Sequence, residues 1–262
     1  MSKDSPIGIF DSGVGGTSIW KEIHELLPLE HTIYLADSDN APYGEKPEEE
    51  IKRLSVKNTE KLLEMGAKII VVACNTATTN AIKHLRSTYN LPFIGIEPAI
   101  KPAALYSRKK CIGILATKGT LSSELFAKTS DLYSKDTKVV EVVGSGLVEL
   151  IERGRKDSPE MEKLLTSLLQ PMIDAEIDYL VLGCSHYPFI IPTLKKILPP
   201  KVSFIDSGMA VAKQTRLVLR SLDLLTESRQ HKPEFFTNGD PHILDRIIPA
   251  PSDTFSISYM DF

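Results

Sequence analysis

The sequence predicts an α/β protein made of two similar lobes, each a parallel β-sheet covered by helices. The first observation is that short apolar runs, rich in β-branched residues, alternate with segments of helical period along most of the chain. Such alternation is typical of βαβ units, which build parallel sheets through right-handed crossovers. The second observation is that the apolar runs of the first half recur in the same order in the second half, at an offset of 105 to 110 residues. An internal repeat of this kind indicates two pseudo-symmetric copies of one structural unit.

The predicted strands of the first half are four apolar runs, at residues 7–11, 32–37, 67–73 and 93–97. Their counterparts in the second half lie at residues 112–115, 137–142, 177–183 and 202–206. The 3.6-residue period predicts helices between them, at residues 17–27, 48–65, 76–89, 122–133 and 159–175. The clearest of these begins with three acidic residues, which suit the start of a helix, and ends at Gly66.

The repeat also predicts where the domains divide. Residues 99–206 would form the second lobe, and residues 1–98 would form most of the first. The tail contains one more helical segment, at residues 210–225, and we expect it to return to the first lobe, so that residues 207–262 complete that domain. Ligands of open α/β sheets bind beyond the carboxyl ends of the strands. We therefore expect the active site in the cleft between the lobes.

Composition excludes several classes of protein. Charged residues make up 25% and hydrophobic residues 42% of the chain, which is usual for a soluble globular protein. A net charge of −3 and a pI near 6.1 offer no electrostatic footprint for nucleic acid or an anionic membrane. No apolar stretch approaches the length of a membrane helix, and the N-terminus lacks a signal-peptide core. Three cysteines, an odd number, argue against a disulfide framework, so we expect a cytoplasmic protein with reduced thiols.

Cys74 and Cys184 occupy equivalent positions, each directly after the third apolar run of its half. A thiol at a strand end, beside the start of the next helix, is expected to have a pKa lowered toward neutrality, where it can accept and return a proton. A lone cysteine is more often a small buried hydrophobe, but the matched placement favours a functional pair. Cys111, by contrast, opens an apolar run and is predicted to serve packing.

Polar residues lie at two strand ends near these thiols. His186 lies two residues after Cys184, where it can orient or protonate a thiolate or a bound carboxylate. Asp11 ends the first run and precedes the turn Gly13-Val-Gly-Gly16, whose backbone N–H groups suit an anion. This turn matches neither the dinucleotide-binding fingerprint nor the P-loop. Structural alternatives stay open, since the histidine could be a satisfied core residue and the aspartate a helix cap.

With these segments in place, the chain resembles the cofactor-independent aspartate/glutamate racemase family, and within it the glutamate racemases. The resemblance is carried by residues 9–16, 37–44, 71–77 and 182–188, with weaker support from residues 95–99 and 237–241. It implies interconversion of L- and D-glutamate without a cofactor or a metal ion, which supplies D-glutamate for peptidoglycan. Related racemases share the two-thiol layout, so aspartate or another amino acid stays open as the substrate, and the protein could be a homodimer.

The resemblance also implies roles for individual residues. Cys74 would accept the α-proton of D-glutamate with the help of Asp11, and Cys184 that of L-glutamate with the help of His186. The residues implied to hold the carboxylates and ammonium of the substrate are Asp11, Ser12, Tyr43, Gly44, Asn75, Thr76, Ser185 and His186. Glu152 matches a family acid near the second thiol, but the Cys-Pro usually found upstream of it is replaced here by Val143-Gly-Ser-Gly, so its role is open.

Two other classes of function would use the same residues. A metal-binding module could use Cys74, Cys184, His186 and Asp11, although Cys-Ser-His is not a usual zinc spacing. A hydrolase built on the Cys184–His186 pair would leave the matched Cys74 unexplained. Inversion of an α-carbon, in contrast, needs one base on each face. Because an α-proton is weakly acidic, we expect the N–H groups of residues 13–16 and of both helix starts to stabilise the carbanion.

Overall fold

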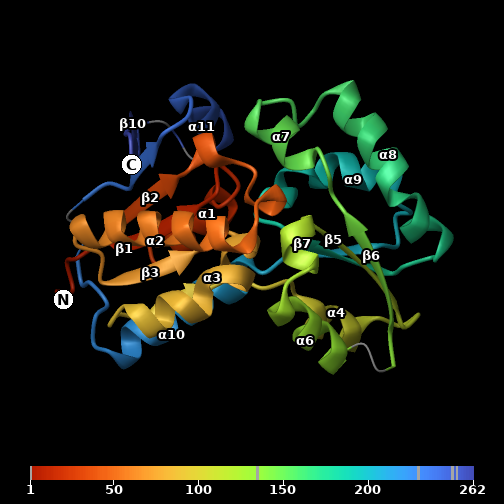
Figure 1. The fold of residues 1–262 in the computed structure, drawn as a ribbon, viewed down its shortest axis with the longest axis horizontal. Helices are drawn as coiled ribbons and strands as arrows, with labels where there is room; N and C mark the ends of the chain where they lie inside the picture. Colours follow the sequence, from red (N-terminus) through yellow and green to blue (C-terminus); the bar gives the residue numbers. More distant parts are fainter. Residues whose placement is uncertain (1, 134–135, 229–230, 249–250, 252) are drawn as a thin grey trace.

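The computed structural model contains two parallel β-sheets side by side (Figure 1). It describes residues 2–133, 136–228, 231–248, 251 and 253–262. The first sheet has the strand order β10-β9-β2-β1-β3-β4 and the second the order β6-β5-β7-β8. The order β2-β1-β3-β4 is thus repeated as β6-β5-β7-β8, which confirms the predicted α/β class and its internal repeat.

The strands of the first sheet are β1 (Ile7–Asp11), β2 (Thr32–Ala36), β3 (Ile69–Val72), β4 (Phe93–Gly95), β9 (Glu234–Thr237) and β10 (Ser256–Tyr259). Every residue of β1, β2 and β3 is buried, which explains why these strands read as continuous apolar runs. The tail returns to this sheet, since β9 pairs with β2 and β10 pairs with β9. Strand β10 was not predicted because it is a mostly exposed edge strand with little apolar character.

The helical segments around the first sheet are α1 (Thr17–Leu26), α2 (Glu48–Glu64), α3 (Asn75–Thr88), α10 (Gly208–Ser221), α11 (Pro241–Ile247) and the short 3-10 turns η1 (Ser38–Asn40) and η2 (Tyr43–Glu45). Helix α1 packs on α10, and α2 packs on α3. Helix α10 ends four residues before the predicted end. Asp223 there adopts a left-handed backbone with a φ of 54°, which terminates a helix.

The second sheet is made of β5 (Cys111–Ala116), β6 (Lys138–Val143), β7 (Tyr179–Gly183) and β8 (Ser203–Ile205). Its helical segments are α4 (Ile100–Tyr106), α5 (Lys118–Leu121), α6 (Glu124–Tyr133), α7 (Leu147–Glu152), α8 (Pro159–Asp174), η3 (Tyr187–Ile190) and α9 (Ile191–Ile197). The helix predicted at residues 122–133 begins later, at Glu124, because the Ser123 hydroxyl accepts the N–H of Phe126 and caps it.

The carboxyl ends of strands from both sheets meet where the lobes touch. The hydroxyl of Ser18 donates to the carbonyl of Ser185 at 2.8 Å, and the amide of Asn80 donates to the carbonyl of Gly119 at 3.0 Å. One hydrophobic cluster contains buried side chains from both lobes. The lobes are therefore in close contact around the strand ends, whereas the domain boundaries at residues 98 and 207 stay a prediction.

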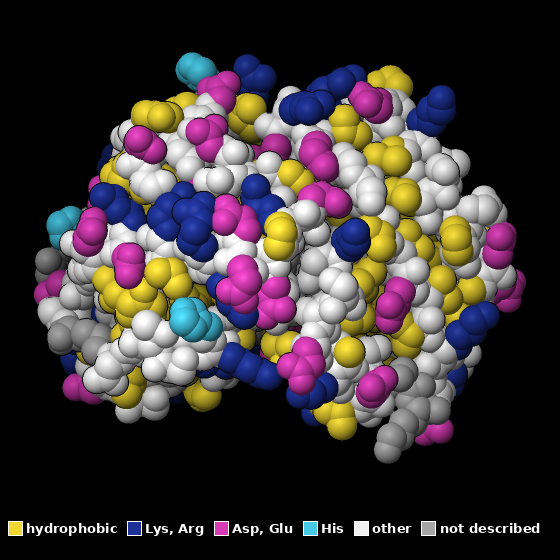
Figure 2. Space-filling model, viewed as in Figure 1, with side chains coloured by type: hydrophobic (Ala, Val, Ile, Leu, Met, Phe, Trp, Pro, Cys, Tyr) yellow, Lys and Arg dark blue, Asp and Glu magenta, His cyan; other side chains and the backbone are white. Residues whose placement is uncertain are grey.

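Basic and acidic side chains are mixed over the visible face of the molecule (Figure 2). Acidic groups are prominent near the seam between the lobes in that view. Within the described ranges, no helix is both long and apolar enough to cross a bilayer.

Candidate active site

Cys74 and Cys184 follow the equivalent strands β3 and β7, as the repeat predicts. Cys74 is the N-cap of α3, and its Sγ accepts the N–H of Ala77 at 3.4 Å and lies 3.6 Å from Oγ of Ser12. The Sγ of Cys184 lies 3.7 Å from Nδ1 of His186. Both thiols are buried, with 4% and 7% of the residue exposed. Each thiol therefore lies beside a different set of polar partners.

Asp11 is fully buried at the end of β1 and connects the two lobes. Its Oδ2 accepts the N–H of Gly16 at 2.8 Å, and its Oδ1 accepts the hydroxyl of Ser185 at 3.2 Å. Burial raises the pKa of Asp11, and the charge of His186 opposes this rise. The contribution of Asp11 to Cys74 is electrostatic, because its hydrogen bonds go to Gly16 and Ser185.

His186 lies between Cys184 and Glu152. Its Nδ1 faces the thiol, and its Nε2 lies 2.5 Å from Oε1 of Glu152. Burial lowers the pKa of His186, but the hydrogen bonds to Cys184 and Glu152 outweigh it and raise the pKa well above its ordinary value. The raised pKa favours the charged form of the ring, which places a positive charge beside the sulfur of Cys184.

Glu152, whose place the sequence does not settle, lies within this cluster. Besides the bond to His186, its Oε1 accepts the N–H of Val14 at 2.7 Å, and its Oε2 accepts the hydroxyl of Ser38 at 3.0 Å. Val14 and Ser38 belong to the first lobe, whereas α7 carries Glu152 on the second. The carboxylate thus joins the lobes while it holds His186.

Backbone N–H groups of the glycine-rich turn at residues 13–16 bind carboxylates of the protein. The N–H of Val14 is taken by Glu152, and the N–H of Gly16 is taken by Asp11. These two donors therefore bind carboxylates of the protein itself, whereas a role of residues 13–16 in stabilising a substrate carbanion stays a prediction.

The glycines of the turn allow side chains of the second lobe to approach the backbone. A Cβ on Gly13 would lie 1.9 Å from Oε1 of Glu152, and one on Gly15 would lie 2.2 Å from Nδ1 of His186. Any larger residue would displace these groups, since real Cβ contacts are never so short.

The expectation of a lowered pKa is wrong for Cys74 in this closed arrangement. Burial raises the pKa of its thiol, and the carboxylate of Asp11 raises it further. The N–H of Ala77 and the hydroxyl of Ser12 act in the opposite direction but with less effect. The helix start therefore does not compensate for the loss of water around the sulfur.

Asn75 is the clearest polar group without a protein partner. It is only 2% exposed, and among the described residues neither its amide nitrogen nor its amide oxygen has a hydrogen-bond partner. Leaving such a group unpaired in the interior is costly. Its side chain is thus free to bind a polar ligand.

Thr76, the next residue, is already paired across the seam. Its Oγ1 lies 2.8 Å from Oγ1 of Thr117 and 3.3 Å from Oγ1 of Thr120. Neither Thr117 nor Thr120 is among the site residues predicted from the sequence. The repeat offers a signal for Thr117, because it stands 105 residues after Ser12, at the equivalent strand end.

Tyr43 and Gly44 lie on the first lobe, opposite Thr117. The hydroxyl of Tyr43 donates to Asp37 and accepts the amide of Asn58 at 3.0 Å. Only the backbone of Tyr43 and Gly44 therefore stays available to a ligand. Gly44 packs closely on the second lobe, since a Cβ on it would lie 2.6 Å from Cβ of Thr117.

The crevice beside this turn is almost closed. It is lined by residues such as Pro42, Gly44, Thr117 and Gly146, and it holds only about 10 Å³ of space. That volume corresponds to about one water molecule. Neither Cys74 nor Cys184 lines this crevice, and both are buried. Over the residues that the structure describes, no group of three or more His, Cys, Asp or Glu side chains is placed to hold a metal ion.

These groups are suited to acid–base chemistry on two faces of one small molecule. Two thiols stand at equivalent strand ends, one beside Asp11 and Ser12 and the other beside His186. The chain belongs to the Asp/Glu/hydantoin racemase family, whose model matches residues 7–215. It is accordingly an isomerase that acts on a small molecule.

The chain is 44% identical to a protein named glutamate racemase from Ectopseudomonas mendocina, over 94% of each chain. Solved structures agree. A glutamate racemase from Bacillus anthracis superposes with a TM-score of 0.86 at 30% identity, covering 99% of this chain and 98% of that one. Escherichia coli glutamate racemase, in complex with L-glutamate and an activator, superposes with a TM-score of 0.84 at 30% identity, covering 97% and 98%.

Proposed function

We propose that this protein interconverts L- and D-glutamate by proton transfer through Cys74 and Cys184, without a cofactor. The observation that carries the proposal is the equivalent placement of the two thiols after β3 and β7. The relatives named as glutamate racemases and the bound L-glutamate of the Escherichia coli enzyme support glutamate as the substrate. The product D-glutamate would supply peptidoglycan synthesis.

In the direction from D- to L-glutamate, the Cys74 thiolate takes the α-proton and becomes a thiol. The Cys184 thiol donates its proton to the opposite face of the carbon and becomes a thiolate. The imidazolium of His186, 3.7 Å away, stabilises that thiolate. In the reverse direction the two sulfurs exchange roles. After each turnover Cys74 and Cys184 have exchanged protonation states, and the reverse reaction, or exchange of one proton with water at each sulfur after product release, restores the starting state.

The raised pKa of Cys74 requires that substrate binding help to ionise it. Asp11, whose charge acts on this thiol, would be the base that takes its proton. The ammonium group of a bound amino acid would favour the thiolate by its charge. The unpaired amide of Asn75, next to Cys74, would bind a substrate carboxylate. Ser12, Thr76, Ser185 and the backbone of Tyr43 and Gly44 would complete the binding site.

Proton exchange in D2O tests this function directly. Purified protein without added cofactor is mixed with L- or D-glutamate, and the α-proton NMR signal and the circular dichroism are followed. From either enantiomer we expect loss of the α-proton signal and decay of the ellipticity to zero. In the Cys74→Ser variant we expect neither change. Exchange with aspartate but not glutamate would change the substrate and keep the mechanism. Absence of exchange with any amino acid would overturn the proposal.

We also propose that the protein works in the cytoplasm. Cys74, Cys111 and Cys184 are all free and buried, which suits a reducing compartment. Assembly as a homodimer stays a prediction, and light scattering of the purified protein would test it.

A further inference from the structure

Asn238 lies in the tail, directly after β9 and beyond the residues that the family model matches. Its side-chain amide bonds two residues of the segment that follows β2. Its Nδ2 donates to Oδ1 of Asp37 at 2.6 Å, and its Oδ1 accepts the N–H of Asp39 at 3.0 Å. We propose that Asn238 is a positioning residue that holds residues 37–44 in the conformation that binds the substrate. This inference rests on the proposed function of the same site.

Asp37 connects Asn238 to the turn that contains Tyr43 and Gly44. It is fully buried, and its carboxylate accepts hydrogen bonds from Asn40 at 2.8 Å, from Lys57 at 2.9 Å and from the hydroxyl of Tyr43. The ring of Tyr43 is only 1% exposed, so its position follows that of the carboxylate. This arrangement fixes the position of the backbone of Tyr43 and Gly44, which belongs to the proposed substrate site.

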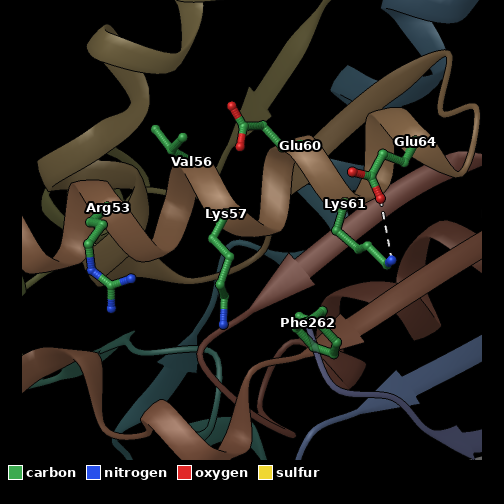
Figure 3. A pocket seen from close by; sticks show the side chains of 7 residues that line it. All are labelled: Arg53, Val56, Lys57, Glu60, Lys61, Glu64 and Phe262. Atoms are coloured by element: carbon green, nitrogen blue, oxygen red, sulfur yellow. Dashed lines mark hydrogen bonds and ion pairs between the residues drawn. The ribbon is translucent and has the colours of Figure 1, made fainter.

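Lys57 and Asn238 hold Asp37 in different ways. Lys57 belongs to a groove of about 420 Å³ on the outside of α2, where it lies near Arg53, Val56 and Phe262 (Figure 3). Its side chain is 26% exposed, so water and salt weaken its ion pair. Asn238 is 6% exposed and uncharged. We expect its hydrogen bonds to be the steadier restraint.

The tail also packs on the residue between Asp37 and Asp39. A Cβ on Gly239 would lie 2.7 Å from Cβ of Ser38, so the backbone of the tail touches this side chain closely. The hydroxyl of Ser38 donates to Oε2 of Glu152 on the second lobe. Residues 238–239 therefore contact the segment after β2 at Asp37, Ser38 and Asp39. Glu152 keeps its bonds to Val14 and His186 without Ser38.

The variant Asn238→Ala removes both side-chain hydrogen bonds and tests the inference. We expect KM for L- and D-glutamate to rise about tenfold, in line with the loss of a hydrogen bond to a charged group. We expect kcat to change by less than about threefold, because the variant alters the binding turn and leaves both thiols in place. Without substrate, we expect the amides of residues 38–44 to exchange with deuterium about tenfold faster.

Asp240→Ala is a matched control on the same tail. The carboxylate of Asp240 caps α11 by accepting the N–H of His242 at 2.9 Å. Its removal should lower Tm but leave KM and the exchange of residues 38–44 unchanged. Asn238→Asp is a second test variant of the same size, which keeps the acceptor for Asp39 and loses the donor to Asp37. Its KM should rise at least as much as that of the alanine variant.

Two results would overturn the inference. One is a KM and an amide exchange within about twofold of wild type in both Asn238 variants. The other is an equal rise of KM in Asp240→Ala, which would reflect general loosening of the tail. The exchange measurement needs no substrate. If the wild-type protein failed to racemise glutamate, the proposed function would be overturned. The amide exchange of residues 38–44 would still decide whether Asn238 positions this segment.

Discussion

Glu152 and Val14 lie on different lobes, and the carboxylate of Glu152 accepts the backbone N–H of Val14 at 2.7 Å. The same oxygen lies 2.5 Å from Nε2 of His186. The carboxylate of Glu152 thus joins the two lobes and also affects the charge of His186, the partner of Cys184. Separation of the lobes would remove the bond to Val14 but leave the bond to His186, since both of those side chains belong to the second lobe.

Glu152→Gln should lower the pKa of His186, because the carboxylate is one of the groups that raise it. The charged form of the ring would then be less favoured, and the sulfur of Cys184 would lose part of the positive charge beside it. We expect kcat to fall at least about tenfold. NMR titration of the His186 ring and steady-state kinetics measure both effects. Glu149→Gln, on the same helix, is the control and should change neither. An unchanged His186 titration in Glu152→Gln would contradict the assignment.

Gly15→Ala should displace His186, since the new Cβ would lie 2.2 Å from Nδ1 of the ring. Misplacement of a catalytic group by about 1 Å costs on the order of 10²-fold in rate, and we expect a loss of kcat of that size. Gly66→Ala is a matched control. It has a φ of 84° and no atom near its Cβ, so it should cost about 1–2 kcal/mol of stability without loss of kcat. Equal activity of the two variants would show that close approach to His186 is unimportant.

Alkylation of Cys74 should be slow in the folded protein, because the thiolate is the reactive form and burial raises the pKa of this thiol. A raised pKa means less thiolate at any given pH, so the rate should increase as the pH rises above 8. We expect iodoacetamide at pH 8 to modify Cys74 at least about 100-fold more slowly than free cysteine. Peptide mass mapping measures the rate, and the urea-unfolded protein is the control. Modification as fast as that of free cysteine would refute the shift.

Lys68→Met should destabilise the first lobe strongly. Lys68 is fully buried, and its Nζ donates to Glu30 at 2.6 Å and to the carbonyl of Leu224 at 2.9 Å. Removing one partner leaves a buried carboxylate unpaired, which costs about 3–5 kcal/mol. Urea unfolding measures the free energy of unfolding. Lys83→Met, at an exposed ion pair with 3.9 Å between its charged atoms, should change it by less than about 1 kcal/mol. A loss below about 1 kcal/mol for Lys68→Met would be inconsistent with a buried pair.

Much of the fold could be predicted because β1, β3, β5 and β7 are buried on both faces and therefore read as continuous apolar runs. The exposed strand β10 and the short helices α4, α9 and α11 carry too weak a pattern and were missed. Among the site residues, Cys74 and Cys184 could be placed because each follows such a run. Thr117 was missed although the repeat places it at the position equivalent to Ser12. Asn238 could not be placed, since its partners Asp37 and Asp39 are distant in sequence and polar contacts of this kind leave no periodic signal.

The sequence alone determined the α/β class, the repeat of one unit, and the placement of a thiol at each of two equivalent strand ends. These features follow from local apolar patterns and from the rule that parallel strands end at the ligand side of a sheet. Only the tertiary structure decided that the N–H groups of Val14 and Gly16 bind the carboxylates of Glu152 and Asp11. It also decided that the pKa of Cys74 is raised. Burial and the approach of groups from another lobe set hydrogen bonds and pKa values, and neither can be read from residues adjacent in the chain.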